Sequence, residues 1–153
     1  LHPLGFDLSW GMLANARTTA QLAQGDALQL PLTDSSVDGA TCGFALRNFV
    51  ELAPFFVELA RVVRPGGRIA LLDVAEPPNP VLKAGYSVYF GKIVPKVGGL
   101  LSDKAAYSYL PRSLAYLPDP DEMMASVRDA GFADAQRTLL SGGLTQLIVG
   151  TRT

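Results

Sequence analysis

The pattern of apolar and polar residues is clearest between Glu51 and Val74, where it predicts a helix, a tight turn and a strand. In the first part, apolar side chains recur at three- and four-residue intervals and gather on one face of a helix. They are Leu52, Phe55, Phe56, Leu59, Val62 and Val63. Arg64-Pro65-Gly66-Gly67 should end this helix, because proline disfavours helical geometry in the preceding residue and glycine accepts positive φ. The apolar run from Ile69 to Val74 is typical of a strand covered on both faces, which completes half of a βαβ unit.

The chain before this segment shows two further strand patterns. Leu4 to Leu8 and Val37 to Phe44 are each expected to form a strand. Ser9 follows the first of them and is a suitable cap for a short helix. These elements fit the alternating order of an α/β sheet.

The C-terminal part of the chain predicts a helix followed by two strands, which distinguishes this fold from a plain Rossmann fold. A helix is expected from Pro120 to Ala130, because Asp119 can cap it and Gly131 can end it. Phe132 to Leu140 and Leu144 to Thr151 then predict two strands joined by a short Gly-rich connection. The sheet should therefore finish on an antiparallel hairpin.

The segment from Pro78 to Leu117 is the least regular and contains all five tyrosines of the chain. Tyr86, Tyr89 and Phe90 are spaced for one helical face, so an aromatic insertion after a strand end could cover an apolar pocket. Ordinary core packing of a helical insertion is the alternative. We expect the insertion to span about residues 78–117.

Composition favours one globular domain over residues 1–153. The chain has 48% hydrophobic and 18% charged residues, which is ordinary for such a fold. A net charge of −1 provides no basic surface for nucleic acid or for an anionic membrane. We therefore expect a small-molecule partner rather than a nucleic acid.

The single cysteine, Cys42, excludes an internal disulfide framework and fits a reducing compartment. We expect it to be a buried apolar residue rather than a nucleophile, since the one histidine, His2, lies at the terminus. No cationic signal peptide and no apolar run of transmembrane length are visible. The sequence thus predicts a cytoplasmic protein.

Two acidic residues are candidates for binding a nucleotide-like ligand. Asp7 stands at the end of the first strand, where a Rossmann-type fold places a carboxylate that holds ribose hydroxyls. An Asp in the turn before a helix is the alternative. Asp26 could bind an exocyclic amine of a purine, or it could simply cap a turn.

A glycine-containing strand leads to the second candidate group. Gly39 and Gly43 would allow another group to approach the backbone closely. Arg47 and Asn48 follow at the carboxyl end of this strand, where open α/β sheets bind their ligands. A surface salt bridge for Arg47 and a helix cap for Asn48 are the alternatives.

Together these segments resemble the ubiquinone/menaquinone biosynthesis C-methyltransferases, class I enzymes that use S-adenosylmethionine. The similar segments span nearly the whole chain. They are Gly5 to Ser9 with Gly11 to Leu13, Gly25 to Ala27 with Leu30 and Pro31, Asp34 to Asp38, Gly43 to Asn48, Glu58 to Arg68, Val94 to Gly98, Tyr107 to Leu110 and Asp129 to Phe132. The Arg-Pro-Gly-Gly turn is common to many such enzymes, whereas Phe-Ala-Leu-Arg-Asn and Val-Pro-Lys-Val-Gly point to the quinone branch.

The resemblance implies a Rossmann-like class I methyltransferase sheet and assigns roles to particular residues. Arg47 and Asn48 would face a prenylated quinol, and Arg47 would assist removal of a proton from its hydroxyl group. The residues implied to bind S-adenosylmethionine are Asp7, Leu8, Met12, Asp26, Ala27 and Gly43. No metal is required, and the quinol could be presented at a membrane surface to a monomer or a homodimer.

The chain also departs from the family pattern. It starts about where the family's second strand should be, so its first strand and the Gly-rich loop after it are absent. We expect an N-terminally truncated sheet without its middle strand. Gly43 also stands where relatives commonly have serine, which removes a hydroxyl group.

Three other functions remain as alternatives. One is a methyltransferase of the same class that acts on another small phenolic or polyketide-like acceptor. A second is a non-catalytic fragment that serves as a partner module, which the missing Gly-rich loop favours. A nicotinamide-binding oxidoreductase is disfavoured, because the same loop is missing and the Pro-Gly-Gly turn is not part of its fingerprint.

Overall fold

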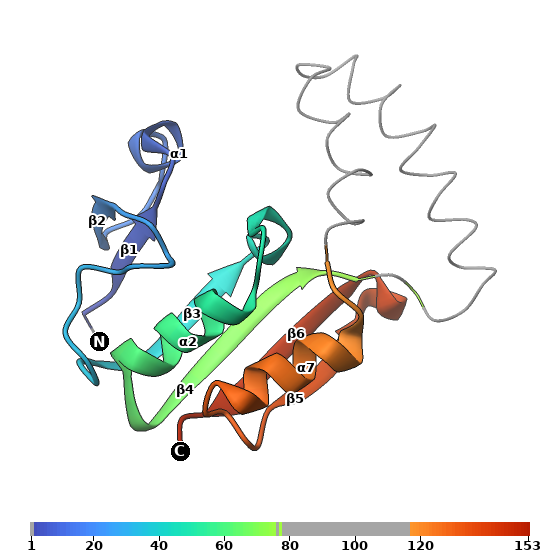
Figure 1. The fold of residues 1–153 in the computed structure, drawn as a ribbon. Helices are drawn as coiled ribbons and strands as arrows, with labels where there is room; N and C mark the ends of the chain where they lie inside the picture. The colour runs from blue at the N-terminus through green and yellow to red at the C-terminus, as the bar shows by residue number, and fades with distance from the viewer. Residues whose placement is uncertain (1, 76, 78–116) are drawn as a thin grey trace, which may run out of the picture.

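The computed structural model describes residues 2–75, 77 and 117–153. Strands and α-helices alternate through most of this part of the chain, and the last two strands form a hairpin (Figure 1). In order, the elements are β1 (Leu4–Asp7), α1 (Trp10–Ala14), β2 (Gln21–Gln24), β3 (Val37–Gly43), η1 (Leu46–Asn48), α2 (Ala53–Val62), β4 (Val63–Val74), α7 (Pro120–Asp129), β5 (Gln136–Leu140), η4 (Ser141–Gly143) and β6 (Thr145–Thr151). The predicted α/β class is confirmed.

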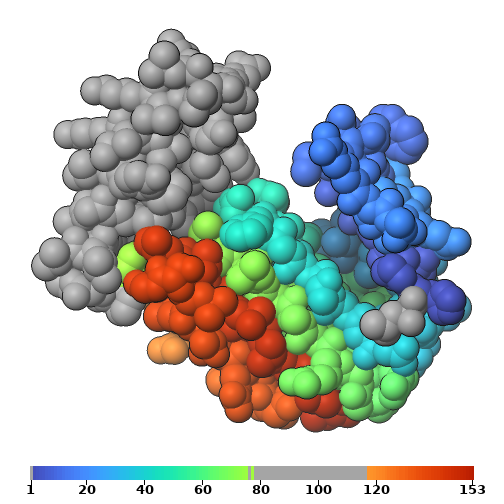
Figure 2. All heavy atoms as spheres, turned by 180° about the vertical axis from the view of Figure 1, so that it is seen from behind, coloured from blue at the N-terminus to red at the C-terminus, as the bar shows by residue number. Residues whose placement is uncertain are grey.

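The strands form two separate sheets. β1 and β2 pair in parallel, and a second sheet has the order β3-β4-β6-β5, in which β3 and β4 are parallel and the hairpin is antiparallel. No strand in the described residues lies between β1 and β3. The surface is hollowed between the N-terminal unit, drawn in blue, and the cyan β3 segment (Figure 2). The two sheets are thus not hydrogen-bonded to each other within the described residues, and the absence of a middle strand stays a prediction.

Helices α2 and α7 pack on the same face of the four-stranded sheet, and the hydrophobic core lies between them and the strands (Figure 1). Along β4, Ile69 and Leu71 are buried, whereas the alternating residues Ala70 and Leu72 are only half-buried. The prediction that both faces of this strand are covered is thus only partly correct. Among the described residues, no helix covers the second face.

The Arg-Pro-Gly-Gly turn reverses the chain as predicted. α2 ends at Val62, and Val63 already pairs with Val37. The next aligned pair is Arg68 with Gly39, so the four residues between Val63 and Arg68 form an irregularity in the pairing of β4 with β3. Gly66 has a φ of 77°, a conformation that glycine adopts without steric penalty.

The C-terminal helix and hairpin also follow the prediction, with one shift. Asp119 Oδ1 accepts a hydrogen bond from the Asp121 amide and caps α7. The strand expected from Phe132 begins at Gln136 instead. Phe132 and Ala135 turn inward and pack against Gly150 of β6, so these residues add to the core before the strand begins.

The N-terminal unit is the most exposed part of the described structure. Ser9 caps α1, since its side chain accepts a hydrogen bond from the Met12 amide, as predicted. None of the residues in β1, α1 or β2 is buried. The unit therefore has no core of its own.

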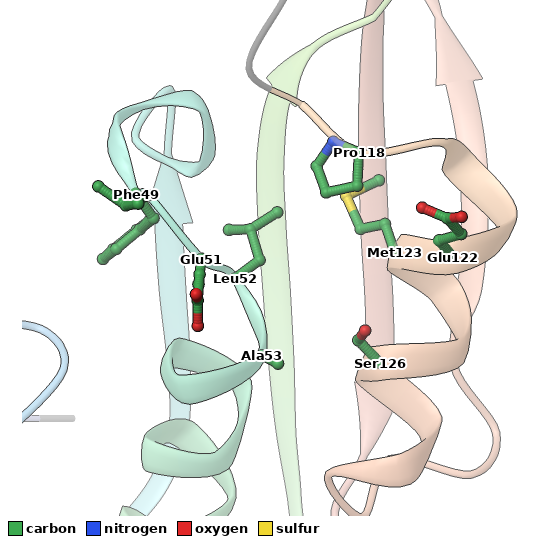
Figure 3. Close-up of a pocket in the computed structure, with 9 residues that line it drawn as sticks. Phe49, Glu51, Leu52, Ala53, Pro118, Glu122, Met123 and Ser126 are labelled. Atoms are coloured by element: carbon green, nitrogen blue, oxygen red, sulfur yellow. The ribbon is translucent and has the colours of Figure 1, made fainter.

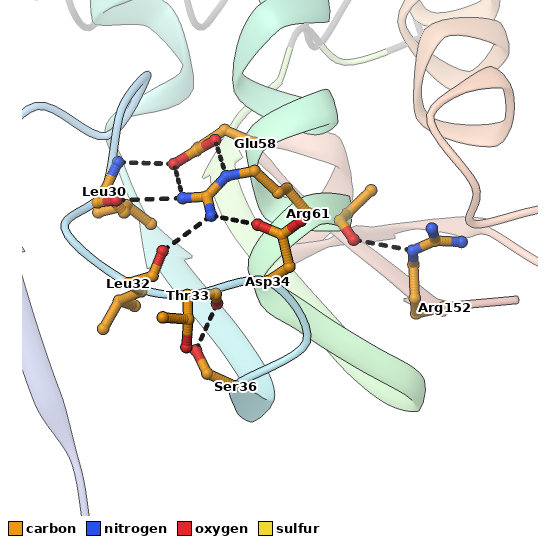
Figure 4. A network of polar contacts seen from close by, with 9 residues as sticks. Leu30, Leu32, Thr33, Asp34, Ser36, Glu58, Arg61 and Arg152 are labelled. Atoms are coloured by element: carbon orange, nitrogen blue, oxygen red, sulfur yellow. Dashed lines mark hydrogen bonds and ion pairs between the residues drawn. The ribbon is translucent and has the colours of Figure 1, made fainter.

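A polar network holds the loop after β2 against α2 (Figure 4). The Arg61 guanidinium donates to Glu58 and to Asp34, with ion-pair distances of 2.7 Å in both cases. It also donates to the carbonyl oxygens of Leu30 and Leu32, and the Leu30 amide donates to Glu58 Oε1 over 2.6 Å. The hydrogen bonds from Arg61 lower the pKa of the Glu58 carboxyl below its usual value. This cluster connects the segment that carries Asp26 to the core.

Nearly all of the expected aromatic insertion, residues 78–116, lies outside the described residues. Leu117, the last residue of the expected insertion, is described and packs against the core. No helix in residues 2–75, 77 and 117–153 is long and apolar enough to cross a membrane.

Candidate active site

Asp7 occupies the predicted position at the carboxyl end of β1. Its Oδ1 atom accepts a hydrogen bond from the Ser9 amide over 2.7 Å, so it contributes to the turn before α1. Oδ2 has no hydrogen-bond partner among the described residues. One oxygen therefore supports the fold, while the other keeps its capacity to accept a hydrogen bond.

Asp26 lies close to Asp7, because the Gly25 amide donates to the Asp7 carbonyl oxygen over 3.2 Å. The exposed Asp26 carboxylate accepts a hydrogen bond from the Leu28 amide over 2.9 Å. The predicted turn cap is thus present. Ala27 is half-buried and packs against the core, which fixes the position of this loop.

Leu8 and Met12 project from the N-terminal unit next to Asp7. Their exposed fractions are 70% and 65%. The Gln24 side chain donates to the Leu8 carbonyl oxygen, which holds the end of β2 against the residue after β1. Apolar side chains at this position could contact an adenine ring.

The two glycines of β3 differ in their surroundings. A Cβ atom on Gly39 would lie 2.6 Å from the Arg68 carbonyl oxygen, so the group that approaches it is strand β4 and not a ligand. At Gly43 a Cβ atom would have no neighbour within 4 Å. The predicted close approach of another group is thus confirmed for Gly39, where that group is β4, and remains a prediction for Gly43.

Arg47, in η1, forms a largely buried ion pair with Asp73 near the end of β4. Arg47 Nη1 lies 2.8 Å from Asp73 Oδ1, and the two side chains are 12% and 0% exposed. The Arg47 guanidinium also lies 6.0 Å from the centre of the Phe44 ring. A salt bridge exists, as one alternative proposed, but it is buried and not at the surface.

Asn48 is the last residue of η1 and is exposed. Its amide donates to the Ala45 carbonyl oxygen over 2.9 Å. The N-cap residue of η1 is Ala45 and that of α2 is Leu52. Asn48 is therefore the N-cap of neither helix.

A hollow of about 330 Å³ lies beyond Asn48, between the start of α2 and α7 (Figure 3). Phe49 and Leu52 contribute apolar surface on one side, and Pro118 and Met123 on the other. The Phe49 ring also stacks on Phe55, with ring centres 4.5 Å apart. Glu51, Glu122 and Ser126 add polar groups to a lining that is otherwise mainly apolar.

Cys42 is half-buried in β3, and burial together with the negative charge of Asp73 raises the pKa of its thiol. A thiol with a raised pKa is a poor nucleophile at neutral pH. Both facts fit the structural role predicted for Cys42. Within the described part of the chain, no cluster of His, Cys, Asp and Glu could hold a metal ion.

The predicted residues form two groups. Asp7, Leu8, Met12, Asp26 and Ala27 belong to the β1-β2 unit, whereas Gly43, Arg47 and Asn48 lie at the end of β3. No hydrogen-bonded strand connects the two groups among the described residues.

Asp73, the partner of Arg47, was not among the candidate residues that the sequence indicated. The available signal was an acidic residue at the end of an apolar strand, the same signal that drew attention to Asp7.

The fold belongs to a known class. A Rossmann-like α/β arrangement that ends in an antiparallel hairpin is that of class I methyltransferases. The chain superposes on a SAM-dependent methyltransferase from Thermotoga maritima, described as a possible histamine N-methyltransferase, with a TM-score of 0.66 and 19% identity. That match covers 98% of this chain and 72% of the other. At this identity the likeness shows the fold alone.

Sequence comparison identifies the family. The ubiE/COQ5 methyltransferase family matches residues 11–152, and the chain belongs to this family. It is 41% identical to the demethylmenaquinone methyltransferase of Roseiflexus castenholzii over 93% of this chain and 60% of that protein. It is 35% identical to the ubiquinone/menaquinone biosynthesis C-methyltransferase UbiE of Syntrophotalea carbinolica over 97% of this chain and 66% of that protein. The chain thus spans about three fifths of the length of these relatives.

Proposed function

We propose that the protein transfers a methyl group from S-adenosylmethionine to a ring carbon of a prenylated quinol in menaquinone or ubiquinone biosynthesis. The carrying observation is the buried Arg47–Asp73 pair at the end of β3, in a chain of the ubiE/COQ5 family. The names of the relatives support the quinol as the acceptor.

The residues of the N-terminal unit fit the proposed cofactor. Among the described residues, one carboxylate oxygen of Asp7 has no partner, which suits a pair of ribose hydroxyl groups. The exposed Leu8 and Met12 side chains would pack beside the adenine, with Asp26 and Ala27 at its edge. Gly43 has open space at its Cβ position, where the methionine part would lie. S-adenosylmethionine, when bound, supplies an electrophilic methyl group on its sulfonium.

Arg47 is the residue that we propose to act on the acceptor. A ring carbon of the quinol becomes nucleophilic when a hydroxyl group loses its proton. A fixed guanidinium stabilises the negative charge that develops on that oxygen, directly or by orienting a water that takes the proton. Asn48 would orient the same ring. The rest of the catalysis is positioning of the donor and the acceptor near contact distance.

The remaining features of the proposal concern the acceptor and the assembly. We propose one methyltransferase domain over residues 1–153, with the insertion at about 78–117 accommodating the prenylated ring. The hollow beside Phe49, whose lining combines apolar side chains with Glu51 and Glu122, is compatible with a prenyl chain. Presentation of the quinol at a membrane surface, a homodimer and a cytoplasmic location remain predictions.

The test is made on the protein as its gene encodes it. Isothermal titration with S-adenosylhomocysteine should show binding, and its absence would refute the proposal. Methyl transfer to demethylmenaquinol should be faster than transfer to a panel of simple phenols.

Two other functions predict different results. Preference for a simple phenol would favour a methyltransferase with another phenolic or polyketide-like acceptor. The separation of the two sheets favours a non-catalytic partner module, and methylation by the 153-residue chain itself would exclude that function.

A further inference from the structure

Asp73 is a fully buried carboxylate whose two oxygens accept three hydrogen bonds. Oδ2 accepts from the Leu46 amide over 2.7 Å. Oδ1 accepts from Arg47 Nη1 over 2.8 Å and from the Val74 amide over 2.7 Å. Because transfer of a charge into the protein interior is unfavourable unless it is paired, these partners explain how Asp73 can lie there.

The same region of β4 fixes the turn that carries Arg47. The Leu72 carbonyl oxygen accepts a hydrogen bond from the Phe44 amide over 2.7 Å. Phe44 has a φ of 59°, which is unusual for a residue with a bulky side chain. Three hydrogen bonds that Leu72 and Asp73 accept therefore hold this turn, two from its backbone amides and one from the Arg47 side chain.

The hydrogen bond to Asp73 leaves part of the Arg47 guanidinium unused. Its Nε atom is buried and has no hydrogen-bond partner in the part of the chain that the structure describes. A buried donor without a partner is unfavourable, so the contacts that hold the guanidinium must outweigh this penalty. The Asp73 carboxylate and the Phe44 ring provide those contacts.

We infer that Asp73 is a positioning residue, which holds the Arg47 guanidinium in the one orientation that stabilises the developing charge on the acceptor oxygen. This inference rests on the function proposed above for Arg47. It assigns Asp73 no contact with the acceptor. Nothing else in the described residues accepts a hydrogen bond from the Arg47 side chain.

Enzyme kinetics on the gene-encoded protein provide the first test. Asp73→Asn should lower kcat for demethylmenaquinol about a hundredfold, since a small misplacement of a catalytic group has effects of that size. The affinity for S-adenosylhomocysteine should not change. In an Arg47→Ala background, Asp73→Asn should lower kcat no further. An equal loss in both backgrounds would show a merely structural role and would overturn the inference.

The second test needs no activity. The ¹H–¹⁵N signal of Arg47 Nε, assigned by its loss in Arg47→Lys, should be protected from solvent exchange in the wild type and lose this protection in Asp73→Asn. The matched control is Asp34→Asn, which removes a carboxylate from the exposed pair with Arg61. Protection that survives Asp73→Asn would overturn the inference.

A second variant covers the case in which Asp73→Asn does not fold. Asp73→Glu keeps the charge and should retain the protected Nε signal at a shifted position, because the acceptor has moved. An unshifted signal would contradict the role of Asp73. If the wild type methylates no phenol or quinol, the proposed function fails, and the Nε signal alone then decides whether Asp73 positions Arg47.

Discussion

At the scale of single residues, Asp7 shows how one carboxylate can stabilise a turn and still be available to a ligand. Its Oδ1 atom accepts the Ser9 amide, and Oδ2 has no partner among the described residues. Both interpretations of Asp7 from the sequence are therefore compatible with the geometry. Arg47 differs, because its Nη1 atom is already bound to a buried partner 26 residues away in the chain.

Asp7→Ala should weaken the binding of S-adenosylhomocysteine. Hydrogen bonds to a charged group are worth about 1.5–3 kcal/mol, so the dissociation constant should rise about tenfold to a hundredfold. Isothermal titration measures the change. Asp38→Ala is the control, since it removes an exposed carboxylate that pairs with Arg64. Unchanged affinity in Asp7→Ala would contradict the proposed ribose contact.

Cys42 should react slowly with iodoacetamide at neutral pH. Its raised pKa means that little thiolate is present, and thiolate is the reactive form. Burial is the main cause of the raised pKa, and Asp73 adds to it. Asp73→Asn should therefore lower the pKa and speed the reaction, which mass spectrometry can follow over a pH series. A rate equal to that of a free thiol in the folded wild type would contradict the prediction.

At the scale of elements, α2 has two roles in the fold. Its apolar face packs on the sheet, as the spacing of Phe55, Phe56 and Leu59 predicted. Its polar residues Glu58 and Arg61 hold the loop that leads from β2 to β3. The periodicity could place these two residues off the apolar face but could not identify their partners.

Glu58→Gln should destabilise the protein by about 1–3 kcal/mol, because it removes a charged acceptor from the Leu30 amide and the Arg61 guanidinium. A denaturation midpoint measured by circular dichroism would show the loss. Val57→Ala, at an exposed position on the same helix, is the control and should change the midpoint little. Equal effects of the two substitutions would argue against a stabilising role of the polar network around Glu58 and Arg61.

The same network should make stability depend on pH. The pKa of Glu58 is lowered in the folded state, so its ionised form is bound more favourably there than in the unfolded chain. This contribution is fully present above the ordinary Glu value of 4.5 and is lost as the pH falls through the lower folded-state value. Denaturation curves between pH 6 and about 3 should show this loss in the wild type and a smaller loss in Glu58→Gln.

At the scale of the whole molecule, stability should be unevenly distributed. The four-stranded sheet with α2 and α7 contains the buried core. The β1-β2 unit, which carries the proposed cofactor residues, has no buried residue. Local opening is easiest where few apolar contacts must be broken.

Hydrogen exchange tests this difference. In the 153-residue chain, amides of β1 and β2 should exchange much faster than those of β4 and β6, which pair with each other from Arg68 to Val74 of β4 and along the whole of β6. Mass spectrometry of proteolytic peptides resolves the two regions. Similar protection in both would show that the N-terminal unit is stabilised by contacts that the described residues do not contain.

The sequence by itself determined most of the described elements and their order, although β2 was not among the strands that it predicted. The helix at Phe55, the turn at Gly66 and the C-terminal hairpin follow from periodicity and local backbone preference, which act over a few residues. It also indicated Asp7 and Arg47 as candidates from their places at strand ends. A resemblance to a family then provided the chemistry.

Only the tertiary structure decided which side chains meet. Asp73 pairs with Arg47, Glu58 accepts the Leu30 amide, and Gly39 lies against β4 and not against a ligand. The partial exposure of the second face of β4 was equally unpredictable, because an apolar run does not state how many helices will cover it. These contacts join segments more than twenty residues apart in the sequence. Local sequence patterns extend over a few residues only and therefore cannot predict them.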